Sequence, residues 1–159
     1  MADKEDREAA RALAAQANVV IRLPAQRRSL LIRMLGLHRQ SGDQGNPAGA
    51  HWRHAPSQNR LGWRERAAYL HGSEPFAVDY QVCHHCQLGW VEEPAITDER
   101  YLRCGLASAG LAALRVEHPG LEWHTLGGHL MATFWRSVDI GVAGGYTQLA
   151  VCPHSTIGG

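Results

Sequence analysis

The order of predicted elements in the second half of the chain is the feature that most constrains its fold. Phe76–Val82 alternates apolar and polar residues as a half-buried strand does, and Gln87–Val91 predicts a second strand. A helix is predicted over Gly105–Glu117 and a further strand over Leu121–Thr125. A strand, a helix and a strand in this order form a unit whose helix covers one face of a sheet. The sequence therefore predicts an α/β chain with an α+β mixed sheet, in which helices flank a central βαβ unit.

The remaining elements are predicted from shorter patterns. The N-terminal half predicts a helix over 3–17, a strand over Val19–Leu23, a helix over 25–39, a Gly- and Pro-rich loop over 40–60 and a short helix over 61–70. Trp52 and the histidines beside it indicate that the loop is partly ordered. The C-terminal part predicts a short helix over Met131–Val138 and a last strand over Tyr146–Cys152.

Length and charge predict one compact domain with two unlike parts. The chain has 159 residues; residues 1–70 carry a net charge of +6 and residues 71–159 carry −5. We divide it into a basic part, 1–75, and a core with a C-terminal tail, 76–159. No stretch of about eighteen apolar residues is present, so we expect no membrane contact. Charges from the third residue onward argue against a secretory signal and predict a cytoplasmic protein with reduced cysteines.

Two pairs of potential metal ligands stand far apart in the sequence. Cys83 and Cys86 have the CxxC spacing of a metal knuckle, in the turn between the two predicted strands, and Cys152 and His154 lie near the C-terminus. Together they form a Cys₃His set, which predicts a closed structural zinc site. Three alternatives remain: His84 or His85 replaces one ligand, the thiols are simply buried, or the CxxC pair is redox-active.

The segment before the predicted helix has the pattern of an anion-binding loop. Arg103-Cys104-Gly105-Leu106-Ala107-Ser108 leads from a strand region into a helix N-terminus. The first N–H groups of a helix lack intrahelical partners and favour an anion. Gly105 would let the backbone approach a phosphate closely.

The run VEEPAITDERYLRCGLASAGLAALRVEHPGLEWHTLGGH, with FWRSVDIGVAGGY after it, resembles the GNAT (acyl-CoA N-acyltransferase) superfamily over about residues 76–150. The family's loop reads Gln/Arg-x-x-Gly-x-Gly/Ala, and here Leu102–Ala107 supplies the glycine and the small residue. Leu102 stands where Gln or Arg is usual. The resemblance implies a GNAT-like mixed sheet around an acyl-CoA-binding core. It also implies that the 83–86 turn and the C-terminal tail lie at one sheet edge, opposite the loop.

The resemblance further implies a direct acetyl transfer from acetyl-CoA to an amine of a small molecule or a protein. The pantetheine arm would lie in a gap between the strand of Leu88, Gly89, Trp90 and Val91 and the parallel strand Leu121–Thr125. N–H groups of Arg103, Cys104, Gly105, Leu106, Ala107 and Ser108 would hold the pyrophosphate. Many members of the family are dimers, so a homodimer is one expected state.

Such a transfer needs a base for the ammonium proton and an acid for the leaving thiolate. Glu92, Glu93 and His124 are the candidate bases. Phe134 and Trp135 occupy the aromatic position where the family usually has its acidic Tyr, which makes Tyr146 the candidate acid.

Two further functions compete with this one. A zinc-stabilised binding module could contact nucleic acid through the Arg-rich half and through Trp52 and Trp63, although no recognised nucleic-acid motif is present. A degenerate GNAT fold could bind CoA or a protein partner without transferring an acyl group.

Overall fold

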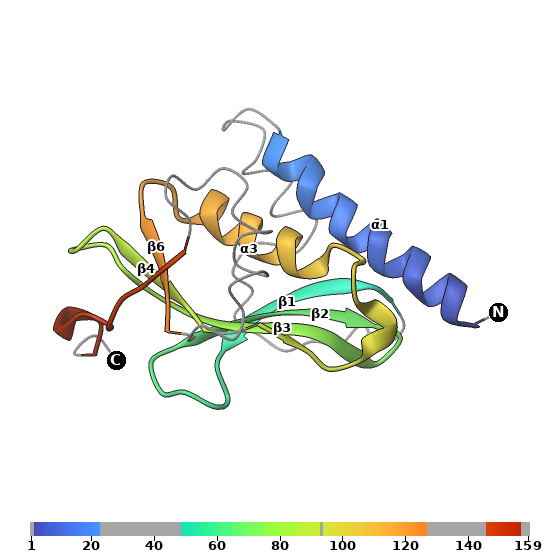
Figure 1. Ribbon diagram of the computed structural model, residues 1–159, viewed down its shortest axis with the longest axis horizontal. Helices are drawn as coiled ribbons and strands as arrows, with labels where there is room; N and C mark the ends of the chain where they lie inside the picture. Colours follow the sequence, from blue (N-terminus) through green and yellow to red (C-terminus); the bar gives the residue numbers. More distant parts are fainter. Residues whose placement is uncertain (1, 23–48, 93, 127–145, 157–159) are drawn as a thin grey trace.

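A mixed sheet with two helices on one face makes up the described part of the protein (Figure 1). The computed structural model describes residues 2–22, 49–92, 94–126 and 146–156. Helix α1 spans Ala2–Arg22 and helix α3 spans Leu106–Glu117. The strands are β1 (His51–Pro56), β2 (Arg64–Leu70), β3 (Ser73–Cys83), β4 (Leu88–Val91), β5 (Ala95–Ile96), β6 (Glu122–Thr125) and β7 (Thr147–Gln148). Two short 3₁₀ turns, η1 (Glu99–Tyr101) and η3 (Pro153–Thr156), complete the described elements.

The seven strands form one sheet in the order β1-β2-β3-β4-β6-β7, and β5 pairs with β3. Strands β1 to β4 are antiparallel to their neighbours, whereas β4 and β6 are parallel, as are β6 and β7. This confirms the predicted α+β mixed sheet and its β4–α3–β6 unit. The predicted strands Phe76–Val82, Gln87–Val91 and Leu121–Thr125 and the helix over Gly105–Glu117 are confirmed within a few residues. Of the last predicted strand, only Thr147–Gln148 is extended.

Three predictions in the N-terminal half are wrong. The strand over Val19–Leu23 is absent, because α1 continues to Arg22. β-Branched residues lower helix propensity by less than about 0.7 kcal/mol each, so an established helix propagates through them. The helix over 61–70 is instead mostly strand β2, whose conformation is decided by hydrogen bonding to β1 and β3 on its two sides. Residues 51–56 of the predicted loop form β1.

Strand β1 was not predicted from the sequence, because the residues that alternate along it are unusual for a strand. Trp52 and His54 are buried and face the helices, while Arg53 is half-buried on the other side. Polar side chains at both kinds of position hide the period of two that identifies a strand. The predicted helices over 25–39 and Met131–Val138, and residues 40–48 of the loop, lie outside the described residues. Within the described segments, no helix is long and apolar enough to cross a membrane.

Small residues let the two helices pack closely on the sheet. Helix α1 buries Ala10, Leu13, Ala14 and Ala17, a spacing that forms one stripe along the helix. At Gly110 of α3, an added Cβ would lie 2.6 Å from Cε1 of Phe76 on β3. The indole Nε1 of Trp52 donates a hydrogen bond to the carbonyl oxygen of Leu13, 3.2 Å away, which joins β1 to α1.

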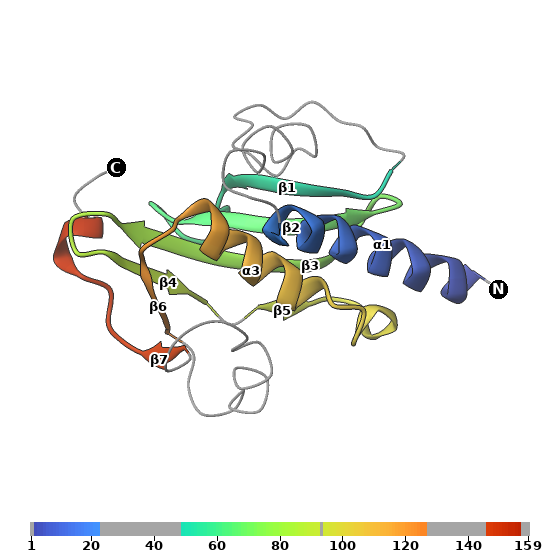
Figure 2. The ribbon, with the colours of Figure 1, turned by 90° about the horizontal axis from the view of Figure 1, so that it is seen from above.

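The two faces of the sheet pack against different parts of the chain. Successive residues of β3 point to opposite faces. Phe76, Val78 and Tyr80 belong to the core under α1 and α3. Cys83 faces the other way, into a second cluster with Trp63 and Trp90. In both views the C-terminal segment lies beside the tip of the β3–β4 hairpin, on the side away from the N-terminus (Figures 1 and 2).

The close approach at Gly110 yields a stability prediction. Replacing Gly110 by Ala forces the Phe76 ring to move, and overpacking of this kind costs about 1–3 kcal/mol. We expect Gly110→Ala to lower the free energy of unfolding by this amount in urea denaturation, although alanine favours a helix intrinsically. Ser108→Ala, at an exposed position of the same helix, should change it by less than about 0.5 kcal/mol. Unchanged stability of Gly110→Ala would contradict the packing of α3 on Phe76.

Candidate metal centre

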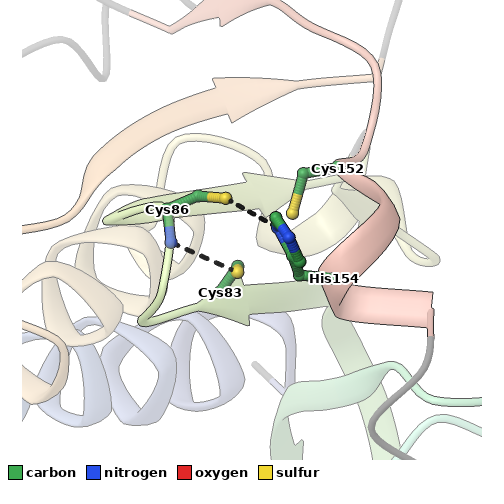
Figure 3. A group of neighbouring side chains, drawn as sticks. All are labelled: Cys83, Cys86, Cys152 and His154. Atoms are coloured by element: carbon green, nitrogen blue, oxygen red, sulfur yellow. Dashed lines mark hydrogen bonds between the residues drawn. The ribbon is translucent and has the colours of Figure 1, made fainter.

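Four side chains from two distant parts of the chain meet at the hairpin tip (Figure 3). Cys83 ends β3 and Cys86 lies in the turn that leads to β4, while Cys152 and His154 come from the C-terminal segment around η3. One potential ligand atom from each residue lies within 4.8 Å of every other. Cys86 Sγ and His154 Nδ1 are 3.2 Å apart. The structure therefore brings together the four predicted ligands.

This geometry fits a tetrahedral ion. With metal–sulfur bonds of about 2.3 Å, two thiolates on one zinc ion are about 3.8 Å apart, so a small contraction of the group suffices. The backbone N–H of Cys86 donates to Cys83 Sγ over 3.4 Å, as expected for a knuckle that stabilises negative charge on sulfur. Thiolates and imidazole together are the donor set that zinc prefers.

Hydrogen bonds hold the C-terminal segment in place beside the ligands. The Ser155 hydroxyl donates to the carbonyl oxygen of Cys152 over 2.8 Å. The side-chain amide of Gln81 donates to the carbonyl oxygen of Ser155, also over 2.8 Å. Because Gln81 precedes Cys83 by two residues on the same strand, both point to the same face of the sheet. The segment thus contacts β3 at Gln81 as well as at its two candidate ligands.

An apolar layer lies under the four ligands. Trp63, Trp90 and Cys83 are buried together. Leu88, Leu126 and Val151 pack against them from three separate elements or loops. Such a layer limits access of water to a metal site and lowers the local dielectric constant.

The pKa values of Cys86 and Cys152 shift in opposite directions. Desolvation raises the pKa of Cys152, but hydrogen bonds from Ser155, Cys83 and Cys86 outweigh it and lower the pKa to about 6. Desolvation and the hydrogen bonds to Cys152 and Cys83 raise the pKa of Cys86 to about 11. Of these two thiols, Cys152 therefore favours the thiolate at neutral pH, and metal binding must displace the proton of Cys86.

The alternative ligands His84 and His85 lie outside this group of four. Both are exposed in the turn. The ring of His85 lies 4.5 Å from that of His154, centroid to centroid, and the ring of His84 lies 5.8 Å from that of His118. Cys104 is buried in the core under the helices, so it lies apart from the four candidate ligands.

The predicted phosphate loop forms a helix N-terminus. Gly105 is the N-cap of α3 with φ of +84°, a left-handed conformation that favours glycine, and Arg103 also has positive φ. Cys104 and Leu106 are buried, Ala107 is half-buried, and Arg103 and Ser108 are exposed. Nearby, Arg7 of α1 donates to the carbonyl oxygen of Arg100 over 2.5 Å.

The expected gap beside β4 is closed, which corrects the prediction of splayed strands. Leu88, Gly89, Trp90 and Val91 pair with β3 on one side and with β6 on the other. Leu126 N–H also donates to the carbonyl oxygen of Val91. The ring of Trp123 lies over Gly89, where an added Cβ would be 2.7 Å from it. Pairing satisfies backbone groups that would otherwise be buried without partners.

The candidate acids and bases have separate partners. Glu92 pairs with Arg60 at 2.6 Å. His124 is buried, with Nδ1 2.8 Å from Thr147 Oγ1 and Nε2 3.5 Å from a Glu122 carboxylate oxygen. The Tyr146 hydroxyl accepts a hydrogen bond from Arg115 over 2.6 Å. Glu93 lies outside the described residues.

The proposed base-stacking residues are not on the surface. Trp52 is 5% exposed and Trp63 is 9% exposed, so neither offers a free face to a nucleotide. Trp52 belongs to the core under the helices, and Trp63 packs against Cys83 and Trp90. This removes the aromatic part of the nucleic-acid hypothesis.

Sequence reasoning missed the residues that support the ligands. Gln81 could have been found from its place two residues before Cys83, and Ser155 from its place beside His154. Trp63 and Trp90 carry no such signal, because only the pairing of strands brings them to Cys83. No protein-family model, no curated protein and no solved structure matches this chain. Its function therefore has to be inferred from its own residues and geometry.

Proposed function

We propose that this chain is a zinc-stabilised binding domain, in which Cys83, Cys86, Cys152 and His154 hold a structural zinc ion. The observation that carries the proposal is the convergence of these four ligand atoms to within 4.8 Å of one another. The two pairs are separated by more than sixty residues in the sequence. A redox-active CxxC pair would need no third thiol and no histidine beside it, so the full set favours a metal.

Four protein ligands complete a tetrahedral coordination sphere and leave no position for water or substrate. Such an ion stabilises structure and does not activate a substrate directly. Its place suits that task, because η3 has four residues and β7 has two, too few to hold the C-terminal segment by themselves. The ion would bind this segment to the β3–β4 hairpin.

Metal analysis tests the ligand set. We expect one zinc per chain by mass spectrometry of protein purified without chelator. Cys152→Ser and His154→Ala should each weaken zinc binding about a hundredfold or more in chelator competition, since even groups that only orient ligands are worth ten- to a hundredfold. Chelator should also make the C-terminal segment sensitive to protease.

The matched control is His85→Ala, which removes an exposed imidazole beside His154 without touching the four ligands. Zinc affinity should stay within about twofold of the parent protein, because no bond to the metal is lost. A loss equal to that of His154→Ala would place His85 in the coordination sphere. Protein without zinc would contradict the proposal as a whole.

We propose as a second candidate an acetyl-CoA-dependent N-acetyltransferase with an amine acceptor. The observation in its favour is the α3 N-terminus, where Gly105 in a left-handed conformation leads into the helix beside the exposed Arg103. The continuous pairing of β4 with β6 is unfavourable to it, since the pantetheine arm would need those strands to separate.

Calorimetric titration with acetyl-CoA separates the two candidates. An acetyltransferase should bind the cofactor with a dissociation constant below about 1 mM, and Arg103→Ala should weaken binding about tenfold by removing a charged contact to phosphate. Arg11→Ala, on the exposed side of α1, should leave binding unchanged. Absence of binding at millimolar ligand would eliminate the acetyltransferase and leave the zinc-stabilised binding domain.

A further inference from the structure

A cleft of about 390 Å³ opens next to the four metal ligands. The start of β2, the end of β3, the 84–87 turn and the C-terminal segment each contribute to its walls. The polar residues that carry the argument are Arg64, Tyr80, Gln81, His84, His85 and His154. Its volume is in the range of sites for small organic molecules.

Arg64 is the main charged group of this cleft. It is half-buried, and its Nε donates to Nε2 of His54 over 3.2 Å, which fixes the side chain at the root of the guanidinium. Its neighbours in β1, β2 and the connecting loop all pair with a carboxylate (Arg53 with Glu65, Arg60 with Glu92, Arg66 with Glu117). Across the residues that the structure describes, Arg64 forms no such pair. A half-buried guanidinium held by an imidazole and by no carboxylate retains the capacity to bind an oxyanion.

The walls of the cleft contain no carboxylate that could take this role. All ten lining residues are described, and they include no Asp or Glu. His84 and His85 contribute imidazole rings to the walls. With zinc bound, the ion would offset two of the three thiolate charges of the cluster, so one negative charge would remain beside the cleft.

Gln81 supplies a second polar group. It is 7% exposed, and its amide nitrogen is used by the carbonyl oxygen of Ser155. This hydrogen bond holds the C-terminal segment as one wall of the cleft.

The edge of β3 adds backbone groups to the same place. Pairing of β2 with β3 ends at Arg64 and Tyr80. The last three residues of β3, Gln81–Cys83, therefore pair only with β4 within the described part of the sheet. An unpaired strand edge offers N–H and C=O groups to a ligand.

We propose that this cleft binds a small molecule that carries a carboxylate or a phosphate group together with a hydrogen-bond donor. The Arg64 guanidinium binds the oxyanion, and the unpaired edge of β3 over Gln81–Cys83 offers its backbone groups to the rest of the ligand. The inference rests on the proposed function, because His154 and Ser155 form one wall of the cleft only while the C-terminal segment is held. The zinc ion thus has a consequence for binding without contacting the ligand.

Anion titration of the zinc-loaded protein tests the proposal. Inorganic phosphate and acetate are added separately at constant ionic strength, and the amide NMR signals of Val82 and Cys83 are followed. We expect a saturable shift with at least one of the two ions, and the tighter ion identifies the class of ligand. Arg64→Gln should weaken that binding about tenfold or more, because a charged hydrogen bond is lost.

Arg60→Gln is the matched control, since Arg60 lies on the loop before β2 and pairs with Glu92. Its affinity for the same ion should equal that of the parent protein. If Arg64→Gln disturbs the sheet, Arg64→Lys keeps the charge without the planar fork and should bind about threefold more weakly. No saturable shift with either ion, or equal affinity of the Arg64 variants and the parent, overturns the proposal.

Zinc content is measured on the same samples. Loss of zinc from the parent protein contradicts the zinc site, whereas zinc-loaded protein that fails to bind either ion contradicts the cleft alone. The two proposals can therefore fail separately.

Discussion

The close packing of α3 on β3 is the constraint on which the rest of the structure depends. Gly110 lets the helix backbone approach the Phe76 ring, and Trp52 packs edge-on against Phe76 with centroids 5.9 Å apart. The same indole binds the carbonyl oxygen of Leu13, so α1 is placed by the sheet as well as by α3. One face of the sheet therefore packs against the helices. The alternate residues of β3, which point to the other face, pack against other parts of the chain.

Those partners are supplied at the hairpin tip. Cys83 and Gln81 share the second face of β3, where Cys83 packs against Trp63 and Trp90, and Gln81 binds Ser155. Three thiols and an imidazole are poor packing partners for one another. The proposed zinc ion would convert that group from a weak contact into a cross-link between β3 and the C-terminal segment. The cleft lined by Arg64 lies next to the four candidate ligands.

The sequence predicted some elements well for identifiable reasons. The hairpin of β3 and β4 follows from alternation and the turn between them, and α3 follows from its length, its apolar positions and the His118-Pro119-Gly120 stop. Strands β1 and β2 escaped because His54, Arg64, Glu65 and Arg66 lie at strand positions where an apolar period is expected. Arg66 is fully buried and pairs with Glu117, a long-range contact with no local signal.

By itself, the sequence determined the identity of the four candidate ligands and the alternation that directs Cys83 away from the helices. Donor chemistry and spacing within each pair are local properties, so they can be read without a fold. Only the tertiary structure decided that the two pairs meet, that β4 and β6 close the predicted acyl-CoA gap, and that Arg64 and Gln81 share a cleft. These are matters of strand order and register between distant segments, which depend on the packing of the whole sheet.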